Sequence, residues 1–379
     1  MPNKSKIETA LSASLRPVIL ESRSKLLHAA EEWTDSSVLG IDTEFIRERT
    51  YRADLGLVQI SNGLTAWLVD PIALDSLEPL EELMRETSVT KILHSGSEVL
   101  EILQNELGTL PNPLVDTQIA CAMLGQPLQM GYHHAVKWLF EIEVDKDQTR
   151  SKWLRRPLSS DQIRYAAVDV VLLPMMLEIL QRRLEDMGRW SWLQEDVARM
   201  QRNSLTGVEP GTSYLRLLRN GRLDDPSLKV LQALAAWREI TAKSKNLARG
   251  FVITDAGLMQ MARLKPGNAS ELRTIDEVHP NVLSRYQEIL LNLIEEAQQS
   301  HAAIVKIEDL NNEQKRKLAA MRQLITTRSK QLDVDPALLG SRRELEKLIR
   351  ATADDEAIPE RFLGWRKSVI TDDLLEILN

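Results

Sequence analysis

Two carboxylates, two residues apart in an apolar run, are the first residues in this sequence whose types suggest chemistry. Asp42 and Glu44 lie within Gly40-Ile41-Asp42-Thr43-Glu44-Phe45, which has the character of a strand. Alternate side chains of a strand point to one face, so the two acids share a face. Carboxylates so placed repel each other and resist desolvation, and a divalent cation such as Mg²⁺ or Mn²⁺ removes both costs. A solvent-facing edge strand explains this pair alone equally well.

A second candidate lies in the helical pattern Tyr165-Ala166-Ala167-Val168-Asp169. Residues four apart share a helix face, so the Tyr165 phenol and the Asp169 carboxylate can address one point. The carboxylate can complete a metal site. The phenol, with an ordinary pKa of about 10, is better suited to orienting a metal-bound water than to acting as a base. Taken alone, the pattern favours a half-buried tyrosine and a solvated aspartate.

A basic segment precedes that helix. Arg150, Lys152, Arg155 and Arg156 surround Trp153 in the run that ends at Leu158. Cations interleaved with an aromatic ring suit RNA or DNA, because the cations contact phosphates and the ring stacks on a base. A solvated loop is the alternative interpretation.

The elements that must position these residues change in type along the chain. In the first half, strand-like runs alternate with helical patterns, which predicts an α/β layered fold. A long helix begins near Ser159, which has capping-box spacing with Gln162, and continues to about Met187. The strand-like runs are 38–41, 55–60, 66–69 and 91–94, and the helical patterns are 97–107, 117–124 and 134–140. After residue 200, two helical segments of similar size, 212–298 and 305–379, indicate a duplicated all-α module.

Composition and charge limit the class of protein. The 379 residues suggest two or three domains, and the single cysteine, Cys121, excludes a disulfide framework, nearly excludes a Cys-based zinc site and favours a cytoplasmic setting. No apolar stretch is long enough to span a membrane, and Met1–Glu21 does not look like a secretory signal. Residues 1–200 hold 21 Lys and Arg against 30 Asp and Glu, while residues 201–379 hold 27 against 25. Part of the acidity of the first half is the carboxylate cluster that needs cations, and the basic segment from Arg150 to Arg156 accompanies it, so the net charge of −7 does not exclude a nucleic-acid partner.

Together these segments resemble ribonuclease D, in the tyrosine-containing branch of the DEDD exonuclease superfamily. The matching motifs, in order, are Ile41-Asp42-Thr43-Glu44-Phe45, Gly56-Leu57-Val58-Gln59-Ile60, His94-Ser95-Gly96-Ser97-Glu98, Asp116-Thr117-Gln118, Trp153-Leu154-Arg155-Arg156-Pro157-Leu158 and Tyr165-Ala166-Ala167-Val168-Asp169. The resemblance implies a ribonuclease-H-like α/β exonuclease domain at 1–204, with a mixed sheet flanked by helices. Two all-α HRDC (helicase and RNase D, C-terminal) domains would follow at 212–298 and 305–379.

The resemblance also implies a reaction. Members are metal-dependent 3′–5′ exoribonucleases that trim structured RNA ends such as tRNA precursors and release nucleoside 5′-monophosphates. Two divalent cations, Mg²⁺ or Mn²⁺, are held by four acids. Asp42, Glu44 and Asp169 match three of these, and Tyr165 matches the water-orienting tyrosine. No membrane and no obligate protein partner are expected. The implied substrate-binding residues are Gln59, His94, Arg150, Lys152, Trp153, Arg155 and Arg156.

The match departs from the family at the fourth acid. The family has an aspartate five residues after the histidine that ends the strand, and here that position is Val99. In the family this acid serves mainly the second metal, so the departure implies a weakened second site. Glu98 is a weak substitute, since neighbouring helical residues diverge by about 100°. Asp116 precedes a helix, and its simplest role is an N-cap.

Three functions are compatible with these motifs. A retained but impaired exonuclease is favoured, because three acids and Tyr165 remain. An RNA-binding protein with a degenerate nuclease site is the alternative. A DNA exonuclease is a third, since proofreading domains share the catalytic core, but the paired helical modules favour RNA by analogy.

Overall fold

A computed structural model describes residues 4–144, 151–220, 223–301, 304 and 309–379. The chain divides into two compact units, each of which is described by itself. The first draws its residues from Met1–Ile46, Leu55–Leu205 and Leu310–Asn379, and the second from Arg47–Asp54 and Thr206–Asp309. The helical segment predicted at 305–379 thus falls largely in the compact unit of the sheet. Within the described residues, no helix is long and apolar enough to cross a membrane.

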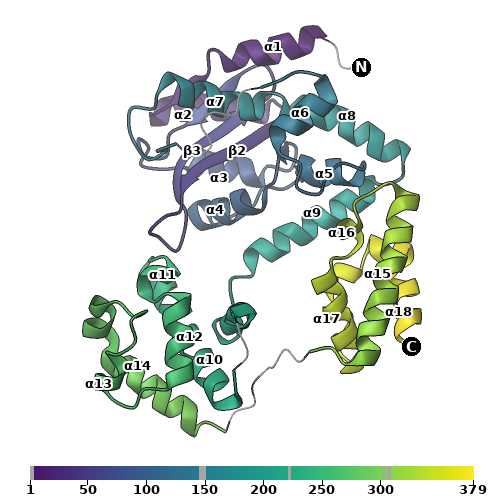
Figure 1. Ribbon diagram of the computed structural model, residues 1–379. Helices are drawn as coiled ribbons and strands as arrows, with labels where there is room; N and C mark the ends of the chain where they lie inside the picture. Colours follow the sequence, from purple (N-terminus) through teal and green to yellow (C-terminus); the bar gives the residue numbers. More distant parts are fainter. Residues whose placement is uncertain (1–3, 145–150, 221–222, 302–303, 305–308) are drawn as a thin grey trace. The chain divides into compact units, whose positions relative to one another are not determined.

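A mixed six-stranded sheet organises the first unit, as the sequence predicts (Figure 1). The strand order is β1-β4-β3-β2-β5-β6; β3 and β4 are antiparallel, and the pairs β1–β4, β2–β5 and β5–β6 are parallel. All four strand-like runs form strands, whereas β1 and β6 are too short for their pattern to predict them. The strands are β1 Val18–Leu20, β2 Val38–Ile46, β3 Asp54–Ser61, β4 Ala66–Val69, β5 Thr90–Leu93 and β6 Leu114–Asp116.

Helices flank this sheet (Figure 1). The prediction of one long helix from Ser159 to about Met187 is wrong, because the segment forms two helices separated at Leu172. Pro174, in the first turn of the second helix, has no N–H to donate, and its ring would clash with the preceding turn of a continuous helix. The capping box at Ser159 is confirmed. The helices are α1 Lys4–Ser14, α2 Arg23–Thr34, α3 Glu78–Arg85, α4 Ser97–Leu107, α5 Thr117–Met123, α6 Tyr132–Phe140, α7 Ser160–Val171, α8 Leu173–Asp186 and α9 Trp190–Leu205.

A close approach at Gly40 brings α7 against β2. A Cβ at Gly40 would lie 2.7 Å from the carbonyl oxygen of Val170 and 2.7 Å from Cβ of Leu173, closer than atoms can pack. Glycine therefore lets the end of α7 rest on the strand backbone. Because Asp42 is two residues beyond Gly40, and Asp169 directly precedes Val170, this contact brings the two acids to the same face.

The C-terminal helices of the first unit are fastened to α9. Both Arg366 terminal nitrogens donate to the Asp196 carboxylate at 2.7 Å, a bidentate pair. Beside it, the rings of Trp192 and Trp365 stack with centroids 4.4 Å apart. The elements are α15 Asn312–Leu332, α16 Pro336–Leu339, α17 Arg342–Ala353, a 3-10 turn Glu360–Phe362, a π-helical turn Lys367–Thr371 and α18 Asp372–Leu378.

The second unit is helical and is built around α10. Leu231 and Leu234 of α10, Leu258 of α12 and Leu290 of α14 are all fully buried in one apolar core. The loop 47–54 belongs to this unit, since the Tyr51 hydroxyl donates to the buried Glu239 at 2.6 Å. The elements are the 3-10 helix Pro210–Asn220, α10 Asp225–Ser244, α11 Arg249–Val252, α12 Asp255–Leu264, α13 Ala269–Leu272 and α14 Pro280–Gln299.

Candidate active site

Three of the predicted acids meet on the face of β2 that α7 covers. Asp42 and Glu44 come from β2, and Asp169 comes from α7. Asp169 is 7% exposed, while Asp42 and Glu44 are half-buried, so the group has one side open to solvent. The three carboxylates are close enough to interact electrostatically. The prediction that Asp42 and Glu44 share a strand face agrees with the structure, and the fold also brings Asp169 beside them.

Each of these acids resists ionisation. Burial raises the pKa of Asp42 to about 7, although the Thr43 N–H donates to its Oδ1 at 2.8 Å and opposes the rise. Burial, followed by repulsion from Asp42 and Asp169, raises the pKa of Glu44 to about 10. Burial and the charge of Asp42 raise the pKa of Asp169 well above its ordinary value, against a hydrogen bond from Tyr165. Burial, with repulsion between neighbouring carboxylates at Glu44 and Asp169, therefore makes the ionised form of these acids costly.

The donor set fits a divalent cation. Among the described residues, no group of three or more His, Cys, Asp or Glu side chains is already arranged to hold a metal ion. However, Oδ1 of Asp169 is buried without a hydrogen-bond partner, which is costly unless something binds it. Carboxylate oxygens are the donors that hard cations prefer, and a bound cation would displace the protons that the raised pKa values indicate.

Val99 supplies no donor at this site. It lies in the first turn of α4 and is 5% exposed, so its side chain belongs to the core. Glu98, the weak substitute considered above, is exposed on the same turn.

The ring of Tyr165 lies between two other rings. Its centroid is 6.1 Å from that of Trp153 and 6.4 Å from that of His133. Trp153 is 1% exposed and packs with Leu57 and other apolar residues. The expectation that Trp153 stacks on a base is therefore replaced by a structural role, holding Tyr165. The sequence gives no signal for His133, because only the fold brings α6 beside α7.

The basic segment separates into buried and exposed cations. Arg156 forms a bidentate pair with Asp70, at 2.6 Å from Nε and 2.7 Å from Nη2, and also donates to the Gly56 carbonyl. Arg156 therefore serves the fold, and the expected contact with substrate does not suit it. Lys152 and Arg155 are exposed. Arg150 lies outside the described residues.

His94 and Gln59 are held inside the protein. The two ring nitrogens of His94 lie 2.8 Å from Thr117 Oγ1 and 2.8 Å from the Met130 carbonyl, and burial lowers the pKa of the ring. This ties the end of β5 to α5, where Asp116 is the N-cap, as the sequence predicts. Gln59 is fully buried in β3, and both of its side-chain amide atoms are without a hydrogen-bond partner.

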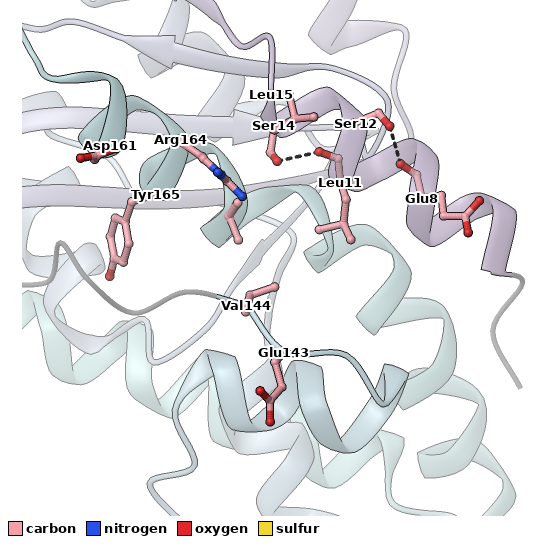
Figure 2. A pocket seen from close by; sticks show the side chains of 11 residues that line it. Glu8, Leu11, Ser12, Ser14, Leu15, Glu143, Val144, Asp161, Arg164 and Tyr165 are labelled. Atoms are coloured by element: carbon pink, nitrogen blue, oxygen red, sulfur yellow. Dashed lines mark hydrogen bonds between the residues drawn. The ribbon is translucent and has the colours of Figure 1, made fainter.

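A cavity of about 550 Å³ opens beside Tyr165 (Figure 2). One wall is α7 and another is α1, a helix that is not among the predicted elements. The buried residues Ile7, Ala10 and Ser14 recur at helical spacing and are the signal that could have revealed it.

Comparison with known proteins identifies the family. The family model for a 3′–5′ exonuclease matches residues 17–185, and that for an HRDC domain matches residues 227–294. Ribonuclease D of Pseudomonas paraeruginosa is 35% identical over 360 residues, covering 94% of this chain and 96% of that protein. Ribonuclease D of Escherichia coli is 32% identical over 349 residues, covering 90% and 92%. The crystal structure of E. coli RNase D, an exoribonuclease involved in structured RNA processing, superposes with a TM-score of 0.88 at 30% identity, over 96% of this chain and 98% of that one. The chain belongs to the ribonuclease D family of 3′–5′ exoribonucleases, whose activity depends on divalent metal.

Proposed function

We propose that this exoribonuclease trims the 3′ ends of structured RNA, such as tRNA precursors, and releases nucleoside 5′-monophosphates. The convergence of Asp42, Glu44 and Asp169 beside Tyr165 carries the proposal. The description of the E. coli relative as an enzyme of structured RNA processing supports the substrate class.

The acids would hold Mg²⁺ or Mn²⁺. When bound, the cations activate water and stabilise the leaving 3′ oxygen. The Tyr165 phenol, held by the neighbouring rings and by its hydrogen bond to Asp169, orients the attacking water. Asp42 and Glu44 are only half-buried, which leaves the cluster open to a phosphate on one side. The exposed Lys152 and Arg155, shortly before α7, neutralise phosphates of the RNA.

The second of two cations would be bound weakly. Val99 replaces the aspartate that serves mainly this cation in the family, and Val99 is buried and apolar. Substrate phosphate and water would have to complete the coordination of the second cation. The same observation favours one other candidate function, an RNA-binding protein whose nuclease site has degenerated.

The wider organisation is part of the proposal. We assign an exonuclease domain to 1–204 and HRDC domains to 212–298 and 305–379. The protein would work in the cytoplasm without an obligate protein partner. Its helical regions would either contact RNA or only pack against neighbouring helices.

The test uses the full chain and an RNA hairpin with a single-stranded 3′ tail, labelled at its 5′ end. With Mg²⁺ or Mn²⁺ we expect stepwise shortening and release of nucleoside 5′-monophosphates, and with EDTA we expect none. Asp42→Asn should remove the activity, and a DNA hairpin of the same sequence should be a poorer substrate. Binding of RNA with no nucleotide release under either metal would contradict an exonuclease and support the degenerate site.

A further inference from the structure

The cavity beside Tyr165 lies next to the proposed reaction centre without being part of the carboxylate cluster. Asp161, Arg164, Tyr165 and Val168 line it at the one-face spacing of α7. Tyr165 also donates a hydrogen bond to Asp169, so a single side chain borders both places. A group in the cavity would therefore lie near a phosphate at the acids.

The opposite wall is α1, which precedes the residues that the exonuclease family model matches. The exonuclease match begins at residue 17, whereas α1 spans Lys4–Ser14. Buried residues of α1 hold the helix in place, and Leu11, Ser12 and Leu15 line the cavity. Figure 2 shows the side chains of Leu11 and Tyr165 directed toward one space from α1 and α7.

The lining suits a flat heterocycle. Leu11, Leu15, Val144 and Val168 offer apolar surface to a ring face. Arg164 is exposed and can stack on a base. A volume of about 550 Å³ is within the range of pockets that hold small organic groups.

The charge of the cavity disfavours a phosphate. Among the described residues that line it, Glu8, Glu143 and Asp161 face one cation, Arg164. Glu143 pairs with Lys137 at 2.6 Å, which leaves Glu8 and Asp161 against Arg164, an excess of one negative charge among these residues. Carboxylates accept hydrogen bonds from the amino groups of bases and repel the phosphate backbone.

From this lining we infer that the cavity between α1 and α7 is a nucleobase-binding subsite for the RNA substrate, with α1 as one of its walls. The inference rests on the proposed function for its choice of ligand. The base of a nucleotide near the scissile bond enters the cavity while its phosphate stays outside.

Equilibrium binding tests the subsite without requiring catalysis. The full chain is titrated against 5′-fluorescein-labelled single-stranded hexamers of A or C in EDTA, and Kd is measured by fluorescence anisotropy. Ser12 is exposed, so Ser12→Trp fills the cavity without disturbing the core. We expect Ser12→Trp to raise Kd about tenfold, the cost of losing one stacked base. Thr9→Trp, at an exposed α1 position that does not line the cavity, is the matched control and should leave Kd within about twofold.

Salt separates a base contact from a phosphate contact. The tenfold ratio should be the same at about 50 and 200 mM salt, because loss of a base contact releases no counterions. A ratio that disappears at the higher salt would overturn the assignment to a base. Leu15→Ala removes one apolar wall and serves as the second variant, with a smaller rise in Kd expected. Unchanged Kd in both variants would overturn the subsite.

Turnover distinguishes this inference from the proposed function. With Mg²⁺ or Mn²⁺, Ser12→Trp should raise KM for RNA and leave hydrolysis of bis(p-nitrophenyl) phosphate, which has no base, unchanged. If the wild type cleaves RNA and Ser12→Trp equals it in KM and Kd, the subsite fails and the function stands. If the wild type cleaves neither substrate but Kd still responds to Ser12→Trp, the function fails and the subsite stands.

Discussion

Two buried aspartates of the first unit have opposite electrostatics. Asp169 on α7 is 7% exposed and Asp196 on α9 is 3% exposed. Burial raises the pKa of Asp169, and the charge of Asp42 raises it further. Burial also acts to raise the pKa of Asp196, but hydrogen bonds and charge from Arg366, with Arg361 behind it, bring that pKa below its ordinary value. Nearly equal burial therefore has opposite consequences, decided by the partners.

The contrast separates a ligand site from a structural joint. At Asp196 the fold supplies the cations, so the acid is satisfied without a ligand. At Asp169 the fold supplies further acids and leaves one oxygen without a partner. A cluster that costs stability and is open to solvent on one side is where a bound cation gains most. Changes at the two aspartates should therefore affect different properties.

The largest effect should come from Asp42→Asn. Removing one carboxylate of the cluster should lower kcat for RNA by about a thousandfold or more, because charge stabilisation at the phosphate is lost. The same change relieves repulsion with Glu44 and Asp169, so the melting temperature in EDTA should stay the same or rise. Rates and calorimetry on one preparation test both. A destabilised, active variant would contradict the assignment of Asp42.

Asp196→Ala should show the reverse pattern. It leaves Arg366, which is 1% exposed, without its carboxylate partner. Breaking a buried ion pair from one side costs about 3–5 kcal/mol, and urea unfolding measures it. Asp373→Ala is the matched control, because its pair with Arg328 is partly exposed and should be worth less than about 1 kcal/mol. Equal losses of unfolding free energy from Asp196→Ala and Asp373→Ala would contradict the conclusion that the Asp196 pair is a buried structural joint.

Val99→Asp places a carboxylate where the family has its fourth metal-binding acid. With Mn²⁺ we expect kcat for RNA to rise about tenfold, through tighter binding of the second cation. In EDTA the variant should lose about 1–3 kcal/mol, since the new carboxylate replaces a side chain that is 5% exposed, and Mn²⁺ should restore part of this.

Val99→Asn is the control, a polar side chain of similar size without the charge. It should lose stability and gain no rate. If Val99→Asp also gains no rate, the missing acid is not what limits the reaction.

In metal-free protein, the carboxylate cluster of Asp42, Glu44 and Asp169 should make stability depend on pH in a way that Asp196 does not. The folded pKa values of Asp42, about 7, and Glu44, about 10, exceed their ordinary values of 3.8 and 4.5. The native state then holds the extra protons, so the stability contribution is present at low pH and falls as pH rises toward these values. The fall is at most about 1.4 kcal/mol per pH unit for each proton.

Urea unfolding in EDTA between about pH 5 and 8 measures this slope. Glu44→Gln should flatten it. Asp196→Asn should leave the slope unchanged. Because the folded pKa of Asp196 is lowered, its contribution to stability is fully present at every pH above its ordinary pKa, and is therefore constant across this window. Saturating Mn²⁺ should abolish the decline.

The sequence predicts the site better than its surroundings. Strand alternation puts Asp42 and Glu44 on one face, and helical spacing joins Tyr165 to Asp169, because both rules act within one element. The capping box at Ser159 was equally predictable. Trp153 and Arg156 were misjudged, since their partners Tyr165 and Asp70 meet them only in the folded chain. Residue type alone does not separate a cation that serves the fold from one that faces solvent.

Arg155 and Arg156 show the same contrast on neighbouring residues, since one is paired within the fold and the other is left for a ligand. We expect the smallest effect here. Arg156 is paired with Asp70, whereas Arg155 is exposed. Arg155→Ala should weaken RNA binding severalfold at low salt and reduce the slope of log Kd against log salt by about 1, the loss of one phosphate contact. Stability should be unchanged. Arg156→Ala should instead lower the melting temperature, because Asp70 is 7% exposed and would lose its partner. A salt slope unaffected by Arg155→Ala would mean that exposure beside the site is not enough to identify a cation that binds RNA.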